Sequence, residues 1–543
     1  MKTLLTGEQS GSLDAATRGT LALEPVQLME KASLRIWDAF RLHISADPGL
    51  SKKDRNLRIV ALCGKGDNGG DALAILRHAF SAGFTNLAAV VSGRESSPSA
   101  LKQAKSLEAA GFHLVAWDGN DEEGMLDMLS GADIVLDGVL GTGLKGAATG
   151  EAKAMIDCLG RAGLKAGAPI VASIDLPSGA GEGWMPGFPC VKADLSFCLE
   201  PVKAACYLPE IRPLCGTLVP VADVFPEILA ERHRELRLLE GSDLALLQAP
   251  VDKTGYKMSR GRLAIFAGSK GAIGAAQLCA RAALASGAGY VTLYVDEELY
   301  PLLAPVLESV IVKTLLGKPA LGAFDAILAG PGWGQGPGRL ELLAHLIDSP
   351  LPLILDADAI RLIAEKPELL SGRKAACAAT PHPGEFSALV DAMAGAPARA
   401  PASAPSADES SALSPWEAMG RVSEAYNLLA VIKSHVTWVV SPGGRRWVWE
   451  GMTPELGTAG SGDVLAGLFA GIAAGRSAEM KRKAGKDRQD AGNMKTALEE
   501  AACMAVIAHG LAGRALADSK GWFQASDLVE ECSSLLHRRK ENA

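Results

Sequence analysis

Short apolar runs alternate with amphipathic stretches along the first half of the chain. Residues 25–45 carry apolar side chains at helical spacing, and a second helix is expected over residues 72–82. The short apolar runs between such stretches are typical of buried strands. We expect strands at residues 58–63, 87–91, 134–137, 170–174 and 195–199. Strands that alternate with helices in this way predict a parallel sheet covered on both faces.

The same alternation resumes after a charged interruption at residues 231–237. We therefore expect an α/β protein of two domains, namely an N-terminal Rossmann-like parallel-sheet sandwich over residues 1–232 and a C-terminal α/β sandwich over residues 233–543. The strands expected in the second domain lie at residues 262–267, 290–295, 326–329, 353–355 and 429–433.

Two segments of the second half do not fit this alternation. Residues 393–414 are rich in Ala, Pro and Ser, and residues 477–496 contain many Lys and Arg. Both compositions are typical of solvated surface segments. We expect a mobile insertion at each of them.

Composition limits the classes of function. The chain has 543 residues and a formal charge of −8, and its ten cysteines contain no C-x-x-C pair. This charge argues against a nucleic-acid or membrane-surface binder, and the cysteines indicate neither a zinc site nor a disulfide framework. No signal peptide and no membrane span are expected, because apolar runs of sufficient length are missing. We expect a cytoplasmic homo-oligomer that binds neither nucleic acid nor a membrane.

Polar and glycine-rich segments follow three expected strands of the first half, at residues 64–71, 137–146 and 175–179. The carboxyl ends of parallel strands meet at one edge of a sheet, where open α/β sheets bind ligands. Oxygen atoms of Asn68, Asp137 and Ser178 could hold a hard monovalent cation there. Asp175 is suited to proton transfer on a bound hydroxylated ring. A tight turn without ligand remains the alternative for residues 64–71, because they match neither common phosphate-loop pattern.

Together with Met29-Glu30 and Ala193-Asp-Leu-Ser196, these segments resemble the NAD(P)H-hydrate epimerase domain over about residues 1–230. The resemblance implies catalysis by Asp175 and a potassium ion at Asn68, Asp137 and Ser178. It also implies that a hydrated nicotinamide nucleotide binds Asp67, Asn68, Gly69, Gly70, Asp71, Gly141, Thr142, Gly143, Leu144, Lys145, Gly146 and Asp175.

Four positions depart from that family's pattern. Lys31 and Asp67 stand where Asn is usual, Lys65 where Pro is usual, and Ala72 where Gly is usual. An added lysine and an added carboxylate beside a phosphate-binding segment could alter affinity. Two interpretations therefore stay open: an active epimerase, or a domain that only binds a nucleotide or a protein partner.

In the second half, Gly460-Ser-Gly-Asp463 precedes an apolar run. The free N–H groups at the start of a helix, together with the helix dipole, favour a bound phosphate at such a segment. Asp463 in the first helical turn could take a proton from an attacking hydroxyl. An ordinary helix N-terminus with an acidic first turn is the alternative. His382, fixed between two prolines, and Lys433, at the end of a buried strand, are further ligand candidates.

These segments resemble the NAD(P)H-hydrate dehydratase domain, a relative of the ribokinase-type kinases, over nearly all of residues 235–537 apart from the two insertions. The matching stretches also include Ala267-Gly-Ser269, Gly330-Pro-Gly-Trp-Gly334, Asp356-Ala-Asp-Ala359 and Thr380–Phe386. The resemblance implies that Ala275, Gly334, His382 and Asp463 contact the hydrated nucleotide. It places the phosphate donor against Lys433, Ser434, His435, Val436, Thr437, Gly460, Ser461 and Gly462. Asp252 and Ser434 depart from the family pattern.

The two resemblances imply one repair reaction for damaged cofactors. The first domain would interconvert the R and S hydrates of NADH and NADPH, and the second would dehydrate the S form. Phosphorylation turns the ring hydroxyl into a good leaving group, so a donor, ADP or ATP, and a magnesium ion are expected. A kinase that phosphorylates a small molecule without elimination is the alternative, because it would use the same anion site and base.

Overall fold

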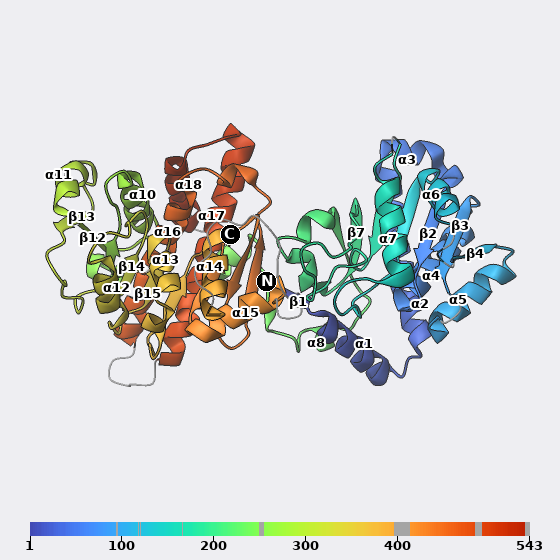
Figure 1. Ribbon diagram of the computed structural model, residues 1–543, viewed down its shortest axis with the longest axis horizontal. Helices are drawn as coiled ribbons and strands as arrows, with labels where there is room; N and C mark the ends of the chain where they lie inside the picture. The colour runs from blue at the N-terminus through green and yellow to red at the C-terminus, as the bar shows by residue number, and fades with distance from the viewer. Residues whose placement is uncertain are drawn as a thin grey trace. The chain divides into compact units, whose positions relative to one another are not determined.

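The computed structural model describes residues 1–93, 96–117, 119, 121–165, 167–248, 255–395, 413–483 and 491–537, without the side chains of 491–493. The chain divides into two compact units, one formed mainly by Lys2–Leu236 and the other mainly by the residues that follow. We call them the N-terminal and the C-terminal unit, and each is described by itself (Figure 1).

The N-terminal unit alternates strands and helices, as the sequence predicts. Its elements are β1 (Lys2–Leu5), α1 (Gly7–Leu21), α2 (Pro25–Ala46), α3 (Pro48–Lys53), β2 (Ile59–Cys63), α4 (Asp67–Ser81), β3 (Leu87–Ser92), α5 (Pro98–Ala109), β4 (Leu114–Trp117), α6 (Glu122–Ser130), β5 (Ile134–Gly138), α7 (Gly150–Ala162), β6 (Ile170–Ile174), β7 (Leu195–Leu199), β8 (Val202–Lys203), β9 (Thr217–Val221) and α8 (Glu227–Ala230).

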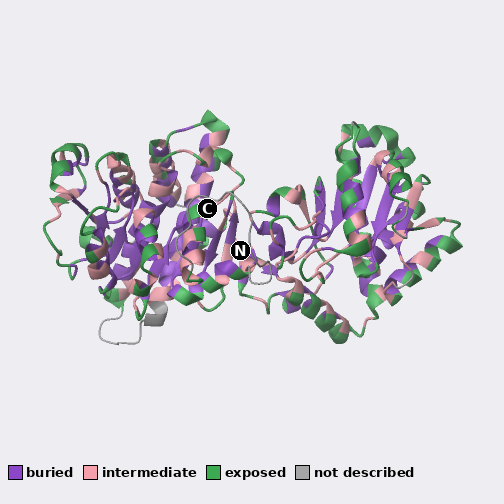
Figure 2. Ribbon diagram, viewed as in Figure 1, coloured by how far each residue is buried: buried purple, intermediate pink, exposed green. Residues whose placement is uncertain are grey.

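Seven strands form one parallel sheet in the order β4-β3-β2-β5-β6-β7-β9. Alternate side chains of β2 enter two different cores. Ile59 and Ala61 pack with α2 and α4, whereas Val60 and Leu62 pack with α6 and α7. Because both faces are covered by helices, every residue of β2 is buried, and the central strands read as continuous apolar runs. Figure 2 shows the buried strands between more exposed helices.

The helix after β2 begins earlier than the sequence analysis predicted. We expected a loop over residues 64–71, but α4 already starts at Asp67. The glycines at its start allow close packing rather than a long turn. A Cβ atom on Gly69 would lie 2.1 Å from the carbonyl oxygen of Gly64, and one on Gly70 would lie 2.6 Å from Cε of Met29. The polar residues of this segment therefore lie on the first turns of a rigid helix.

The C-terminal unit repeats the alternation on a larger scale. Its elements are β10 (Leu236–Leu238), α9 (Asp243–Leu247), β11 (Arg262–Phe266), α10 (Ile273–Ala285), β12 (Tyr290–Val295), α11 (Tyr300–Leu303), β13 (Ile311–Thr314), β14 (Ala326–Ala329), α12 (Arg339–Ile347), β15 (Leu353–Leu355), α13 (Asp358–Glu365), β16 (Cys377–Ala379), α14 (Pro383–Met393), α15 (Pro415–Tyr426), β17 (Leu429–Ile432), β18 (Val436–Val440), β19 (Arg446–Glu450), α16 (Ser461–Lys483), α17 (Ala491–Lys520) and α18 (Ala525–His537).

The sheet of this unit includes the run β13-β12-β11-β14-β15-β16-β17-β18-β19. The strands are parallel as far as β17, and β18 and β19 continue the sheet as antiparallel strands. Consecutive parallel strands bring the ends of β11, β14, β15, β16 and β17 to one edge of the sheet. The prediction of a two-domain α/β protein built on parallel sheets is confirmed.

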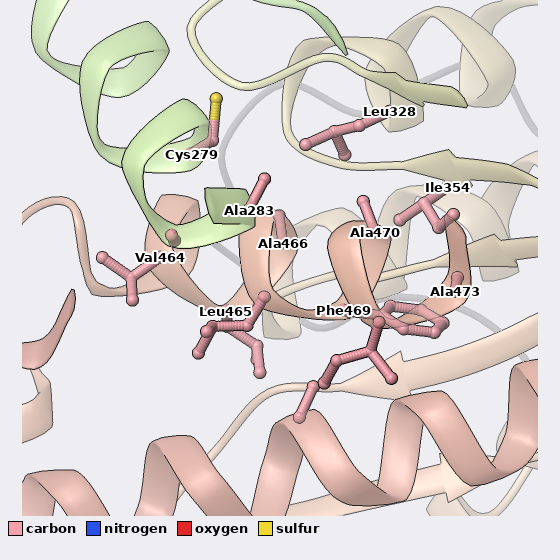
Figure 3. Close-up of a cluster of buried hydrophobic side chains, with 14 of the residues drawn as sticks. Cys279, Ala283, Leu328, Ile354, Val464, Leu465, Ala466, Phe469, Ala470 and Ala473 are labelled. Atoms are coloured by element: carbon pink, nitrogen blue, oxygen red, sulfur yellow. The ribbon is translucent and has the colours of Figure 1, made fainter. Parts of the chain in front are cut away.

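The helix α16 crosses the core of the C-terminal unit. Its residues Val464, Ala466 and Phe469 are buried together with Cys279 of α10 and Leu328 of β14 (Figure 3). Two glycines allow α10 to lie directly against it. A Cβ atom on Gly467 would lie 2.2 Å from the carbonyl oxygen of Cys279, and one on Gly471 would lie 2.7 Å from that of Ala283. The contact between these two helices is therefore made partly by backbone.

The segment 477–496 is not the solvated excursion that we expected. Helix α16 continues as far as Lys483, and Ser477 and Ala478 are buried in it. Small side chains after the apolar run extend the packed face of the helix. The basic residues that follow them made this segment look solvated in the sequence. Residues 484–490, and residues 396–412 of the other expected insertion, lie outside the described residues. Among the described helices, none is long and apolar enough to cross a membrane.

Candidate active sites

A cavity of about 1040 Å³ opens at the carboxyl ends of β2, β5 and β6 in the N-terminal unit. Helix α1 contributes to one side of it. The lining residues used below are Asp14 and Arg18 of α1, Lys65, Asp67, Asn68 and Asp71 around the start of α4, Gly141, Thr142, Gly143, Leu144 and Lys145 after β5, and Asp175 and Lys203. This is the edge at which an open parallel sheet binds its ligand.

The residues predicted to hold potassium are joined by hydrogen bonds beside this cavity. Asp137 is fully buried and accepts hydrogen bonds from Ser173 Oγ (2.7 Å), Ser178 N (2.9 Å) and Ser178 Oγ (2.5 Å). Asn68 donates to the carbonyl oxygen of Leu140 (2.9 Å), as does Ser178 Oγ (3.1 Å). Burial raises the pKa of Asp137, and these hydrogen bonds oppose that rise. Five oxygen-bearing groups thus meet at the Asp137–Leu140 segment.

Asp175 occupies an unusual backbone position. Its φ of 68° is left-handed, a region that Asp tolerates better than most residues. The carboxylate accepts hydrogen bonds from the backbone N–H of Leu199 (3.1 Å) and from the ammonium of Lys203 (2.5 Å). Lys203 is only 1% exposed and also donates to the carbonyl oxygen of Leu199 (3.3 Å). The carboxylate is therefore held in one orientation at the cavity wall.

A second carboxyl group lies on the same cavity with an unsatisfied atom. Oδ1 of Asp71 is shielded from solvent and has no hydrogen-bond partner among the described residues. Its pKa is well above the usual range, chiefly because of burial and then because of the charges of Asp175, Asp67 and Asp14, which Lys203 opposes. A buried oxygen without a partner is uncommon in native proteins and is often found at functional sites.

In the C-terminal unit, a buried ion pair lies at the ends of β15 and β17. Asp356 is 2% exposed, and its Oδ1 accepts hydrogen bonds from Thr380 Oγ1 (2.5 Å) and from Lys433 Nζ (2.9 Å). Lys433 also faces the first turn of α16, because a Cβ atom on Gly462 would lie 3.4 Å from its Nζ. The lysine therefore lies between a buried carboxylate and the start of that helix.

Asp463 lies in the first turn of α16, as predicted. Gly460 precedes the helix with a φ of 91°, which a side chain would strain. The pKa of Asp463 rises to about 7, first because of burial and then because of the negative charge of Asp356, while Lys433 opposes the rise. A carboxyl group with this pKa exchanges protons readily at neutral pH, as a general base must.

The start of α16 is held by a partly buried histidine. His509 Nε2 lies 3.1 Å from Oγ of Ser461 and 3.1 Å from its carbonyl oxygen. Burial lowers the pKa of His509 to about 4, so the ring is neutral at pH 7 and adds no charge beside Asp463.

Small residues that follow β11 and β14 lie at the same edge of the sheet. A Cβ atom on Gly332 would lie 2.8 Å from the Cβ atoms of both Ala272 and Ala275, and Ser269 Oγ donates to the carbonyl oxygen of Gly332 (2.9 Å). The backbone N–H of Gly334 donates to Asp358 (2.7 Å). Ala275, predicted to contact the hydrated nucleotide, thus lies against Gly332, two residues before Gly334, for which the same contact is predicted.

The chain matches the family model described as NAD(P)H-hydrate dehydratase over residues 263–534. It matches the model described as YjeF-related protein N-terminus over residues 25–205. The bifunctional NAD(P)H-hydrate repair enzyme of Gloeobacter violaceus is 32% identical over 493 residues, which cover 87% of this chain and 89% of that protein. The chain belongs to the family of bifunctional NAD(P)H-hydrate repair enzymes.

A second relative agrees with this assignment. The repair enzyme of the same name from Moorella thermoacetica is 28% identical over 491 residues, covering 87% of this chain and 88% of that protein. Among solved structures, an ADP/ATP-dependent NAD(P)H-hydrate dehydratase from Bacillus subtilis, co-crystallised with ATP and Mg²⁺, is 22% identical. It covers 56% of this chain and 98% of its own, with a TM-score of 0.43.

Some residues predicted to bind the epimerase substrate do not reach the cavity of this repair enzyme. Gly69 and Gly70 are buried under the start of α4, and Gly146 is not part of the cavity lining. The sequence could not separate glycines that pack from glycines that contact a ligand. The other residues predicted for this substrate line the cavity.

The four departures from the family pattern have different positions in the structure. Lys31 donates to the carbonyl oxygen of Val224 (3.0 Å) and does not line the cavity, and Ala72 is fully buried. Lys65 and Asp67 do line it. Lys65 forms an ion pair with Glu151 (3.3 Å), and Asp67 accepts a hydrogen bond from Ser97 (2.6 Å). Only these two can alter the charge of the cavity.

His382 caps helix α14. Its Nδ1 accepts hydrogen bonds from the backbone N–H groups of Gly384 (3.0 Å) and Glu385 (3.3 Å), and its Nε2 lies 3.2 Å from Glu385 Oε1. Because Nδ1 acts as an acceptor, Nε2 carries the hydrogen. The ring is half exposed and is fixed by the helix that it caps, so a ligand would meet it in one orientation.

The residues predicted for the phosphate donor divide into two groups. Lys433, Gly460, Ser461 and Gly462 surround the start of α16, whereas Val436 lies on β18 with its side chain fully buried. Ser434 and His435 are joined by a 3.1 Å contact between Oγ and Nδ1, and Thr437 Oγ1 donates to the carbonyl oxygen of Ser434 (3.2 Å). Asp252 lies outside the described residues.

Sequence reasoning missed four charged residues of the repair enzyme's first cavity, namely Asp14, Arg18, Glu151 and Lys203. Asp14 and Arg18 lie one helical turn apart on α1 and form an ion pair (2.6 Å). Lys203 offered a weak signal, because it is a lysine directly after apolar strand residues, and lysines are almost never fully buried unless paired.

Proposed function

We propose that the N-terminal unit interconverts the R and S hydrates of NADH and NADPH, and that the C-terminal unit dehydrates the S hydrate with ADP or ATP as phosphoryl donor. The family assignment supports both activities. The observation that carries the dehydratase is the position of Asp463, half-buried in the first turn of α16 with a pKa of about 7.

In the dehydratase, Asp463 takes the proton from the ring hydroxyl, whose oxygen then attacks the terminal phosphoryl group of the donor. The N–H groups at Gly460–Gly462 and the ammonium of Lys433 stabilise the negative charge on that group. Loss of phosphate and of a ring proton then restores the dihydronicotinamide. Magnesium, bound mainly through donor phosphate oxygens, would neutralise further charge.

A kinase without elimination is the second candidate, since it needs the same anion site and base. Similarity along most of the chain to bifunctional NAD(P)H-hydrate repair enzymes favours the dehydratase. The two activities differ in product. Only the dehydratase forms a dihydronicotinamide, whose absorbance band can be measured.

Potassium is proposed as the resident ion of the N-terminal site. Oxygen ligands suit hard cations of low charge, and Asn68, Asp137 and Ser178 meet at one backbone segment. A bound cation would order the loop after β5, whose residues 141–145 line the cavity. It would thereby fix the binding surface without taking part in proton transfer.

The test is recovery of dihydronicotinamide absorbance from a mixture of R and S NADH hydrates, with purified protein, magnesium and either ADP or ATP. Complete recovery supports both activities, and the faster donor identifies the cosubstrate. Recovery that stops at the S fraction, and continues only as fast as spontaneous epimerisation, would reduce the N-terminal unit to a binding module. Phosphorylated product without absorbance would establish the kinase.

A further inference from the structure

The N-terminal cavity contains four aspartates with different partners. Asp14 pairs with Arg18, Asp67 accepts from Ser97, and Asp175 pairs with Lys203. Asp71 has a shielded Oδ1 without a partner. One carboxyl group on this cavity is thus held beside a buried ammonium, and another has none.

The two groups therefore have different electrostatic surroundings. Asp175 forms an ion pair with Lys203, and the side chains of Lys203 and Asp175 are only 2% and 14% exposed, so each needs the other's charge. Asp71 is pushed the other way. Burial and the charges of Asp175, Asp67 and Asp14 raise its pKa, which favours its protonated form. Two carboxyl groups in such different surroundings on one cavity are a recurrent acid–base arrangement.

We propose that Asp71 and Asp175 are the acid–base pair of the epimerisation and that Lys203 is a positioning residue that holds the carboxyl group of Asp175 at the cavity wall. This inference rests on the proposed epimerase function and deepens it.

The step balances without a redox partner. Asp71 gives its proton to the hydroxyl oxygen on the carbinol carbon, the C–O bond breaks, and water leaves. The lone pair of the ring nitrogen forms a C=N bond to that carbon. Water then adds to the opposite face, a new C–O bond forms, the C=N electrons return to nitrogen, and the surplus proton passes to Asp175.

The net result is inversion at one carbon and transfer of one proton from Asp71 to Asp175. In the reverse direction the two groups exchange roles, as the interconversion of two epimers requires. Solvent resets the protons after the product leaves. The oxygen of the product hydroxyl comes from water.

The first experiment compares D71N with the wild-type full-length protein. We expect D71N to lower the epimerase kcat by about 10²- to 10⁴-fold, the usual contribution of a general acid. Dehydration of pure S hydrate by the same polypeptide should be unchanged and reports that the chain is folded. The matched control is D157N, which removes an exposed carboxylate on α7 that pairs only with Lys153 among the described residues. It should leave both rates at wild-type values.

The second experiment tests Lys203 through the pH profile of the epimerase. In K203M the carboxylate of Asp175 loses its positive partner, so the fall in rate at low pH should move to higher pH. K203R keeps the charge and should restore much of the wild-type profile. A residue that only supports the fold would lower the rate without moving the profile.

A third measurement follows the oxygen atom. Epimerisation in H₂¹⁸O should place ¹⁸O in the inverted hydrate, and retention of the original oxygen would overturn the proposed C–O cleavage. Epimerase rates of D71N equal to those of the wild type would overturn the role of Asp71. Absence of any epimerase activity in the wild type would instead remove the proposed function on which the inference rests.

Discussion

Lys433 Nζ lies 2.9 Å from Oδ1 of Asp356, although the two residues are 77 positions apart in the chain. The pair acts on a third residue, because Asp356 raises and Lys433 lowers the pKa of Asp463. Burial is the largest cause of the raised pKa of this base, and two opposite charges at the ends of β15 and β17 adjust it.

The rate of dehydration should depend on pH through Asp463. Its pKa of about 7 means that the group is ionised, and able to accept a proton, only above neutrality. We expect kcat to fall about tenfold per pH unit below pH 7 and to level off above it. The measurement is recovery of NADH from pure S hydrate at saturating donor, corrected for the reaction without enzyme. A profile that falls only below pH 5 would contradict the assignment.

Changes at the two flanking charges should move this profile in opposite directions. D356N removes the negative charge and leaves Lys433 without its partner, so the fall in kcat should shift to lower pH. K433M removes the positive charge, so the fall should shift to higher pH. Lys433 is also expected to contact the donor, and its loss will raise the KM for the donor as well. The position of the kcat profile, not its height, is the readout.

Asp463 should destabilise the folded protein at high pH, where its half-buried carboxyl group is ionised. A carboxyl group whose pKa is higher in the folded than in the unfolded state stabilises the fold at low pH, and this contribution is lost as pH rises through about 7. We expect D463N to lower kcat by about 10²-fold or more. We also expect it to raise the free energy of unfolding, relative to the wild type, by up to a few kcal/mol more at pH 8 than at pH 4.

Denaturant titration at both pH values tests this prediction. A stability difference that does not change with pH would mean that the group is not perturbed. Lower stability of D463N at pH 8 would contradict the sign.

The contact between α10 and α16 should not tolerate a methyl group. In G467A the new Cβ atom would lie 2.2 Å from the carbonyl oxygen of Cys279, which is backbone and cannot rotate away. We expect a loss of about 1–3 kcal/mol in the free energy of unfolding, despite the better helix propensity of Ala. G160A on α7 is the control, since its Cβ atom would meet nothing within 4 Å. Equal stability of the two variants would contradict the packing described here.

Removal of potassium should affect only one of the two activities. Replacement of K⁺ by tetramethylammonium, which is too large for the oxygen atoms around Asp137, should lower the epimerase rate. The dehydratase rate on S hydrate should change little. S178A removes one oxygen from the site. The epimerase of this variant should therefore need a higher potassium concentration to reach half of its maximal rate. Epimerase activity that is indifferent to potassium would exclude the ion.

The strands could be predicted well from the sequence, and the reason is burial. Ile170–Ile174, Leu195–Leu199 and Tyr290–Val295 have the expected bounds because both faces of a parallel sheet are covered. Helix bounds were less reliable. The glycines at the start of α4 indicated a loop but allow close packing, and the basic end of α16 concealed its buried residues.

The sequence predicted Asp175 directly after a buried strand and Asp463 in the first turn of a helix, and the structure has both at these places. Lys203 and Arg18 were missed, because they reach the cavity from β8 and α1 through tertiary packing that no local pattern records. The domain boundary at residue 232, the homo-oligomer and the cytoplasmic location stay predictions.

The left-handed backbone at Asp175 limits which substitutions at this position can be interpreted. Only Gly, Asn and Asp enter that region at low cost, so most replacements would be rejected for shape before chemistry is tested. In a mutational scan, the position would look intolerant for two unrelated reasons at once. Asn is the replacement that keeps the shape and removes the charge, and it alone can separate the contribution of the carboxylate from that of the turn.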